Sequence, residues 1–194
     1  MSGSVRTFIA LKLPPEIILL LHRVQQDLKR LNIRARWVRP ENIHLTLKFL
    51  GDTLTDAVDR IGAEMADTAG EFAPISLAVK GLGVFPGIKR PRVVWVGIGG
   101  DTQALFALQN RLEEKLGAFG FPGEKRAFKA HLTLGRIKNA ANPEIVRQMI
   151  KKFADLSSED FILKHLILYK SDLKPSGAVY SQLKQAKLGM TNGE

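Results

Sequence analysis

Hydrophobic residues recur along this chain at two spacings, and the spacing changes from one segment to the next. Apolar residues at every second position, or in short unbroken runs, predict strands at 5–13, 44–47, 75–84, 92–100, 131–134, 162–169 and 179–183. Apolar residues at every third or fourth position predict amphipathic helices at 14–31, 56–70, 101–118 and 143–155. Strands and helices therefore alternate through the whole chain.

The predicted elements follow the same order in both halves of the chain. A shift of 87 residues places the strand at 5–13 on 92–100 and the helix at 14–31 on 101–118, and the later elements follow. Each half has the order β-α-β-α-β-β, and the strand at 92–97 both closes the first unit and opens the second. We therefore expect a tandem duplication, with pseudo-repeats at about 5–97 and 92–184 inside one bilobal domain spanning 1–194.

This pattern predicts an α+β fold with pseudo-two-fold symmetry. We expect mostly antiparallel sheets, packed by helices on their outer faces and arranged around a central groove. Because the two units share the strand at 92–97, they are expected to share or exchange strands. Loops rich in glycine, proline and basic residues are predicted at 85–91 and 171–177.

Composition is that of an ordinary globular protein. The chain has 194 residues, of which 45% are hydrophobic and 25% charged. No apolar run approaches the length that crosses a bilayer, and the first residues lack signal-peptide features. Cysteine is absent, which excludes disulfides, thiolate metal sites and thiol nucleophiles. We expect a cytoplasmic monomer without membrane association.

Net charge adds information about the partner. The formal charge is +10, and the isoelectric point is near 10.0. Such an excess favours a polyanionic partner, most simply nucleic acid. The alternative is a basic surface whose side chains are simply solvated.

The tetrapeptide His-Leu-Thr-Leu occurs twice, beginning at His44 and at His131, which are 87 residues apart. The chain has only four histidines and eight threonines, so chance places a threonine two residues after a given histidine about 4% of the time. Alternate residues of a strand point to one face. Each motif therefore presents one imidazole and one hydroxyl, from Thr46 or Thr133, on the same side.

Several kinds of chemistry are excluded or disfavoured by the motifs. Threonine is a poor metal ligand, and neither tetrapeptide contains a carboxylate, so we expect no metal. The chain has no Gly-x-Ser-x-Gly elbow, no complete Gly-x-Gly-x-x-Gly and no Walker A lysine. We expect no cofactor.

Paired histidines are suited to acid–base catalysis at phosphorus. An imidazole titrates near neutrality, so one ring accepts the proton of an attacking oxygen while the other protonates the leaving oxygen. The two threonine hydroxyls are placed to donate to the non-bridging oxygens. A cyclic phosphodiester fits this chemistry well because its leaving oxygen stays attached to the same molecule.

The paired motifs, spaced by about half the chain, resemble those of the two-histidine phosphoesterase superfamily. More narrowly, the chain resembles the LigT-like RNA 2′,3′-cyclic phosphodiesterases, also known as 2′-5′ RNA ligases. The segments at 36–51, 92–97 and 168–173 carry the resemblance beyond the motifs. It implies hydrolysis of a terminal RNA 2′,3′-cyclic phosphate to a 2′-phosphomonoester. It also implies that His44 is the proton donor and His131 the proton acceptor, roles that the residues alone do not distinguish.

Basic residues near the motifs are candidates for holding the phosphate. Alternation places Lys48 on the face of His44 and Lys129 on the face of His131. Arg136 resembles an arginine that the family uses near the phosphate. Strict alternation puts this arginine on the opposite face, so a bulge at Gly135 is needed to re-aim it. The alternative for each lysine is a solvated basic rim.

Three functions remain open at this point. The first is a metal-independent phosphodiesterase acting on RNA with a 2′,3′-cyclic phosphate end, such as a tRNA fragment. The second keeps the chemistry but acts on small cyclic nucleotides, or runs the reverse 2′-5′ ligation. The third is an RNA-binding module without turnover.

Overall fold

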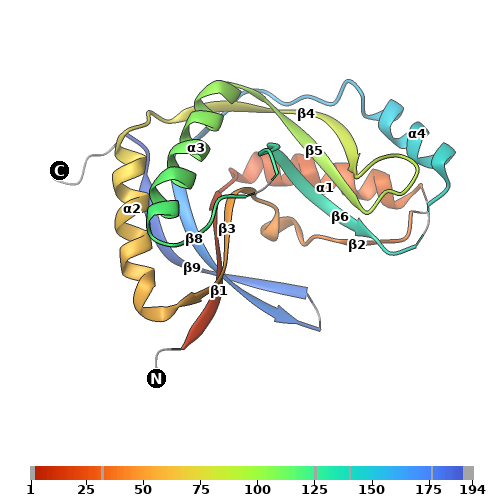
Figure 1. The fold of residues 1–194 in the computed structure, drawn as a ribbon. Helices are drawn as coiled ribbons and strands as arrows, with labels where there is room; N and C mark the ends of the chain where they lie inside the picture. Colours follow the sequence, from red (N-terminus) through yellow and green to blue (C-terminus); the bar gives the residue numbers. More distant parts are fainter. Residues whose placement is uncertain (1–2, 32, 125, 140, 176, 190–194) are drawn as a thin grey trace.

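The structure is a computed structural model that describes residues 3–31, 33–124, 126–139, 141–175 and 177–189 (Figure 1). Its strands are β1 (Ser4–Leu11), β2 (Ala35–Trp37), β3 (Leu45–Leu54), β4 (Ile75–Phe85), β5 (Val93–Gly100), β6 (His131–Ile137), β7 (Phe161–Leu163), β8 (His165–Lys174) and β9 (Gly177–Lys187). Its helices are α1 (Pro15–Lys29), α2 (Val58–Gly70), α3 (Thr102–Ala118) and α4 (Pro143–Lys152), with short 3-10 turns η1 (Pro40–Asn42) and η2 (Thr55–Ala57).

The strands form two antiparallel sheets, which confirms the α+β class. The first sheet has four strands in the order β3-β1-β8-β9, and the second has five in the order β2-β6-β5-β4-β7. Each sheet combines strands from both halves of the chain. The first-half strand β4 pairs with β5 in the second sheet, while the second-half strand β8 pairs with β1 in the first.

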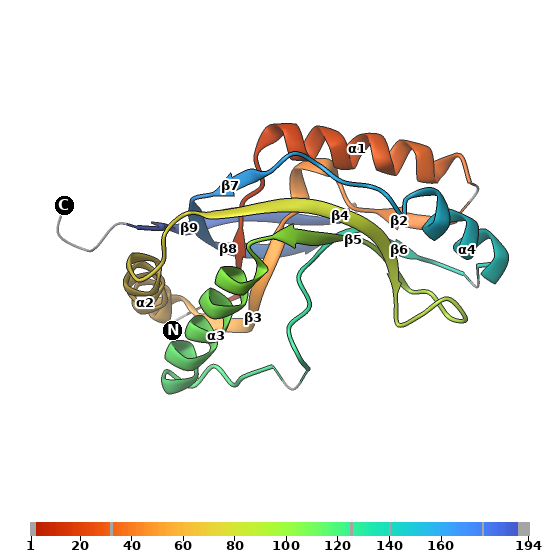
Figure 2. The same ribbon diagram turned by 90° about the horizontal axis from the view of Figure 1, so that it is seen from above.

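The helices cover the outer faces of the two sheets (Figures 1 and 2). Helices α2 and α3 lie side by side against the first sheet, whereas α1 lies along the second. The expected apolar stripes are buried, with Leu21 and Leu28 of α1 and Leu105 and Leu112 of α3 fully enclosed. Each buried leucine contributes about 2 kcal/mol through the hydrophobic effect.

Helices α1 and α3 both cross from one sheet to the other. Helix α1 follows β1 of the first sheet but packs on the second, while α3 follows β5 of the second sheet but packs on the first. Each helix therefore supports the sheet that contains the motif of the other half. Because of this crossing, the helix that packs on the core side of each motif strand comes from the other half of the chain.

Some predicted boundaries differ from the structure. Residues 171–177 were expected to form a loop, but β8 and β9 continue as a paired hairpin as far as Lys174 and Gly177. The predicted strand at 162–169 is divided between β7 and β8, which lie in different sheets. The three-residue strand β2 was not predicted, and β7 was not separated from β8, because three residues are too few to establish a period.

None of the helices in the described part of the chain is long and apolar enough to span a membrane. The division into repeats at 5–97 and 92–184 stays a prediction.

Candidate active site

The two motifs lie at corresponding positions in the two sheets. His44 immediately precedes β3, which pairs with β1, and His131 is the first residue of β6, which pairs with β5. Thr46 and Thr133 each follow two residues later and are partly exposed, while the leucines beside them are buried. The alternation predicted for the two tetrapeptides is therefore present.

Both imidazole rings are oriented by the same hydrogen bond. Nδ1 of His44 donates to the carbonyl oxygen of Asn42 at 2.7 Å, and Nδ1 of His131 donates to that of Lys129 at 2.6 Å. A carbonyl oxygen can only accept, so the hydrogen lies on Nδ1 in each ring. Nε2 is then left in both rings as the nitrogen that exchanges a proton with a substrate.

Aromatic side chains surround both histidines. Phe8 stacks on His44 with 4.7 Å between ring centroids, and Tyr180 approaches the same ring edge-on at 5.3 Å. In the second sheet, Phe85 approaches His131 edge-on at 5.1 Å, and the ring of Trp95 lies 6.4 Å away. The rings around His44 help to shield its imidazole from water, and in both motifs the ring contacts restrict the orientation of the imidazole.

Burial changes the acid–base behaviour of His44. Its pKa is lowered from 6.5 to about 4, mainly by desolvation; the hydrogen bond to Asn42 opposes this shift, and the charge of His131 adds to it. His44 is therefore neutral at pH 7 in the free protein. The strands of the two motifs, β3 and β6, contact each other, so the fold brings the motifs together.

Each motif strand contains a β-bulge immediately after its threonine. In β3, Thr46 faces Ala10 and Lys48 faces Ile9, so Leu47 is the extra residue. In β6, Thr133 faces Trp95 and Gly135 faces Val94, so Leu134 is the extra residue. A bulge shifts the alternation by one residue, so the side chains that follow it exchange faces until the next irregularity, which in β3 falls at Leu50.

The bulge in β3 overturns the expectation for Lys48. Its side chain points away from His44 into the core, where it is 1% exposed. The ammonium donates to Glu113 Oε2 at 2.5 Å and to the carbonyl oxygen of Pro122 at 3.0 Å. Lys48 is therefore part of a buried ion pair and is not placed to hold a phosphate.

The bulge in β6 has the opposite consequence for Arg136. The expected bulge is present, one residue earlier than predicted, and Arg136 shares the face of Thr133 and is exposed. Desolvation raises the pKa of Tyr180, the residue that packs against His44, and the charge of Arg136 opposes this shift. Lys129 is exposed before β6, with its ammonium 5.8 Å from the centroid of the Phe85 ring.

Sequence reasoning missed several residues of this site. Phe8 was identifiable, because the 87-residue shift places it on Trp95. Asn42 orients His44 through its carbonyl oxygen and also donates from Nδ2 to Ala178 at 2.9 Å. Arg36 of β2 pairs directly with Arg136, but nothing in the sequence indicated a strand there.

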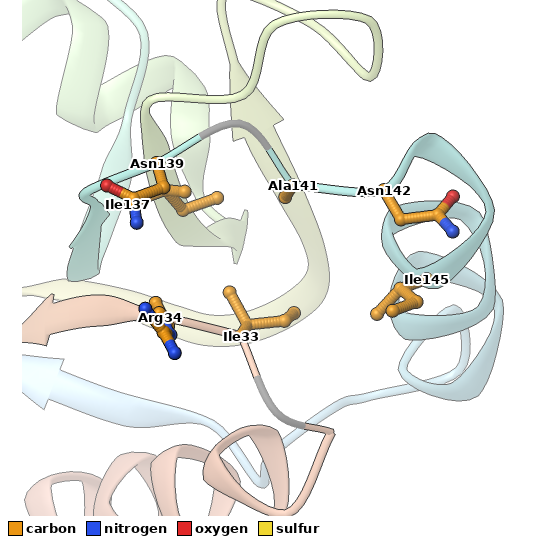
Figure 3. A pocket seen from close by; sticks show the side chains of 7 residues that line it. All are labelled: Ile33, Arg34, Ile137, Asn139, Ala141, Asn142 and Ile145. Atoms are coloured by element: carbon orange, nitrogen blue, oxygen red, sulfur yellow. The ribbon is translucent and has the colours of Figure 1, made fainter.

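A separate cavity of about 290 Å³ lies at the far end of β6, next to the start of α4 (Figure 3). Its lining residues are Ile33, Arg34, Ile137, Asn139, Ala141, Asn142 and Ile145. None of the predicted catalytic or phosphate-binding residues lines it.

The fold and the candidate site together consist of two antiparallel sheets, each carrying one His-Leu-Thr-Leu motif whose imidazole and hydroxyl share a face. A family model described as LigT like Phosphoesterase matches residues 11–95 and 98–180, and each matched stretch contains one His-Leu-Thr-Leu motif. The chain belongs to this family.

Relatives and solved structures agree with this assignment. RNA 2′,3′-cyclic phosphodiesterase of Methanothermobacter thermautotrophicus is 31% identical over 185 residues, which cover 95% of this chain and 100% of that protein. The crystal structure of TT0787 of Thermus thermophilus is 28% identical with a TM-score of 0.74, covering 95% of this chain and 98% of that one. Escherichia coli LigT complexed with 3′-AMP shares the fold, with a TM-score of 0.76 at 24% identity and coverage of 97% and 100%.

Proposed function

We propose that this protein hydrolyses the 2′,3′-cyclic phosphodiester at the end of an RNA to a 2′-phosphomonoester. The observation that carries the proposal is the pair of histidines, each with Nδ1 bound to a carbonyl oxygen and Nε2 left for proton transfer. Relatives of matching length are named RNA 2′,3′-cyclic phosphodiesterase, and the net charge of +10 favours a polyanionic substrate.

The proposed reaction consumes one water molecule. Nε2 of His131 takes a proton from the water as its oxygen attacks phosphorus. The bond from phosphorus to the 3′ oxygen then breaks, and Nε2 of His44 protonates that oxygen. The hydroxyls of Thr46 and Thr133 and the guanidinium of Arg136 stabilise the charge on the non-bridging oxygens. Lys129 contributes from the rim.

The proposed donor role requires a proton on His44, which is neutral at pH 7 in the free protein. An anionic phosphodiester in the groove favours the charged imidazolium and raises the pKa of His44 again. Substrate binding and protonation of His44 are therefore coupled in this proposal. The assignment of donor and acceptor follows the family resemblance.

The first experiment is a product analysis. An oligoribonucleotide with a 2′,3′-cyclic phosphate end is incubated with the protein in excess EDTA, and the phosphate is located on the 2′ or the 3′ oxygen. We expect a 2′-phosphate. His44→Ala and His131→Ala should each lose on the order of 10²- to 10⁴-fold in kcat, while His22→Ala, a histidine outside the groove, stays active.

Other outcomes of this experiment contradict the proposal. A 3′-phosphate product would reverse which bond breaks. RNA binding without any product would indicate a binding module. A cyclic mononucleotide hydrolysed with a higher kcat/KM than the oligonucleotide would make small nucleotides the substrate. Ligation belongs to the proposal as the reverse reaction, in which an RNA hydroxyl replaces water and the same histidines act.

A second experiment assigns the two proton transfers. A cyclic substrate with sulfur in place of the bridging 3′ oxygen has a leaving group that needs no protonation. It should therefore restore most activity to the variant lacking the proton donor and none to the variant lacking the acceptor. We expect rescue of His44→Ala only, and rescue of His131→Ala alone would exchange the two roles.

The proposal also includes that the protein acts as a monomer in the cytoplasm. One chain supplies both histidines, so a second copy is not required to complete the site. The absence of cysteine fits a reducing compartment.

A further inference from the structure

Two buried glutamines lie behind the active-site strands. Gln25 of α1 is 1% exposed and Gln109 of α3 is 4% exposed. Both side chains lie in the core, and the proposed reaction uses neither of them. Burying an amide is costly unless its hydrogen-bonding groups are satisfied, so the partners of these two side chains indicate why they are there.

Gln25 binds the bulge of the second motif. Its Nε2 donates to the carbonyl oxygen of Leu134 at 2.8 Å and to that of Val38 at 2.8 Å. Leu134 is the bulged residue between Thr133 and the re-aimed Arg136. Val38 belongs to the segment that leads through η1 to His44, and its N–H also donates to Leu134. One amide group therefore connects parts of both motifs.

Gln109 of α3 makes a comparable contact in the other half, although the 87-residue shift does not place Gln25 on it. Its Nε2 donates to the carbonyl oxygen of Leu47, the bulged residue of β3, at 3.4 Å and to Glu113 Oε1 at 3.2 Å. Glu113 accepts from Lys48, which also donates to Pro122 in the segment leading to His131. Here a glutamine, a glutamate and a lysine make the connection that Gln25 makes alone.

We infer that Gln25 and Gln109 are positioning residues, and that each holds the bulged backbone of one motif strand in place. Each lies on the helix that precedes one motif and binds the bulge of the other motif. A bulge interrupts the hydrogen-bond ladder, so its geometry needs support from outside the sheet. Without Gln25, relaxation of β6 to regular alternation would return Arg136 to the core face.

This inference rests on the proposed function for its activity readout. A double-mutant cycle separates positioning from general stabilisation. Arg136→Ala alone should lower kcat/KM on the order of 10²-fold, and Gln25→Leu should lower it by a similar factor through misplacement. In the Gln25→Leu background, Arg136→Ala should cost less than about threefold, because the guanidinium is already displaced.

Matched controls come from the same helix and from a conservative change. Gln26→Leu replaces the exposed neighbouring glutamine, and its effect should be additive with Arg136→Ala. Gln25→Glu keeps a donor only while its carboxyl is protonated, so its activity should fall toward higher pH relative to the wild type. This variant keeps the test available if Gln25→Leu does not fold.

A readout without substrate distinguishes failure of this inference from failure of the proposed function. Hydrogen exchange at the amides of 133–137 should accelerate in Gln25→Leu and stay unchanged in Gln26→Leu. Unchanged exchange, or additive effects of Gln25→Leu and Arg136→Ala in folded protein, would overturn the positioning role. If the wild-type protein is inactive but Gln25→Leu still accelerates hydrogen exchange, only the proposed function is overturned.

Discussion

At the scale of single residues, two histidines in identical tetrapeptides have different environments. His44 is enclosed by Phe8 and Tyr180, and burial lowers its pKa to about 4. His131 lies beside Phe85 and is bound by a carbonyl oxygen of an exposed segment. The pseudo-symmetry of the chain therefore does not make the two rings chemically equivalent.

The lowered pKa of His44 predicts a pH-dependent stability. The unfolded chain, with an ordinary histidine pKa of 6.5, binds the proton more readily than the folded one, whose pKa is about 4. The free energy of unfolding should therefore fall as pH falls from 6.5 toward 4, with His44 contributing on the order of 3 kcal/mol. His44→Gln, which is neutral throughout, should lack this contribution.

Urea denaturation at pH 7 and pH 4 measures the effect. His22→Gln is the matched control, because this histidine lies on α1 outside the groove, and it should keep the wild-type pH dependence. An identical loss of stability on acidification in wild type and His44→Gln would contradict the prediction.

At the scale of elements, the two bulges that follow the motif threonines decide which side chains share a face with the histidines. They fall at Leu47 and Leu134, which are 87 residues apart, like the histidines. A bulge of the same kind turns Lys48 into the core and turns Arg136 to the exposed face of Thr133. Alternation predicted the faces of His44 and His131 correctly because those residues precede the bulge.

Beyond the bulge, alternation gave the wrong face for Lys48. A one-residue insertion in the register reverses the side chains that follow it, until the next irregularity. No local sequence signal marks this insertion, because buried leucines occupy both the bulged and the regular positions. Arg136 was identified only through the family resemblance, which implied that a bulge must re-aim it.

The buried position of Lys48 predicts a structural phenotype. Lys48→Met leaves Glu113, whose side chain is 18% exposed, without its cation, so the free energy of unfolding should fall by about 3 kcal/mol. Lys129→Met, at an exposed lysine, should stay within about 0.5 kcal/mol of wild type. Chemical denaturation measures both, and normal stability with weakened substrate binding in Lys48→Met would restore the phosphate-holding hypothesis.

At the scale of the whole molecule, the two halves depend on each other. β1 and β8, from different halves, pair at the centre of the first sheet, and β6 lies between β2 and β5 in the second. Helices α1 and α3 add crossed support through Gln25 and Gln109. Neither half contains a complete sheet, so neither can bury its apolar faces alone.

This arrangement predicts that fragments 1–100 and 101–194 do not fold separately. Each should lack a cooperative unfolding transition by circular dichroism, because each sheet would lose inner strand partners. An equimolar mixture should recover the spectrum of the intact protein, since the cut falls between β5 and α3. If fragment 1–100 folds cooperatively by itself, pairing between strands of the two halves is not required for stability, and the prediction is wrong.

The sequence by itself determined most of the elements and the two histidine motifs, because hydrophobic periodicity and exact repetition are local properties of the chain. It also indicated the family through segments that extend well beyond the motifs. Only the tertiary structure decided which sheet each strand joins, which face Lys48 and Arg136 occupy, and that Phe8 and Tyr180 enclose His44. These features depend on pairing and burial between residues that are far apart in sequence. A bulge of one residue, or a helix that crosses between sheets, changes the environment of the side chains around it.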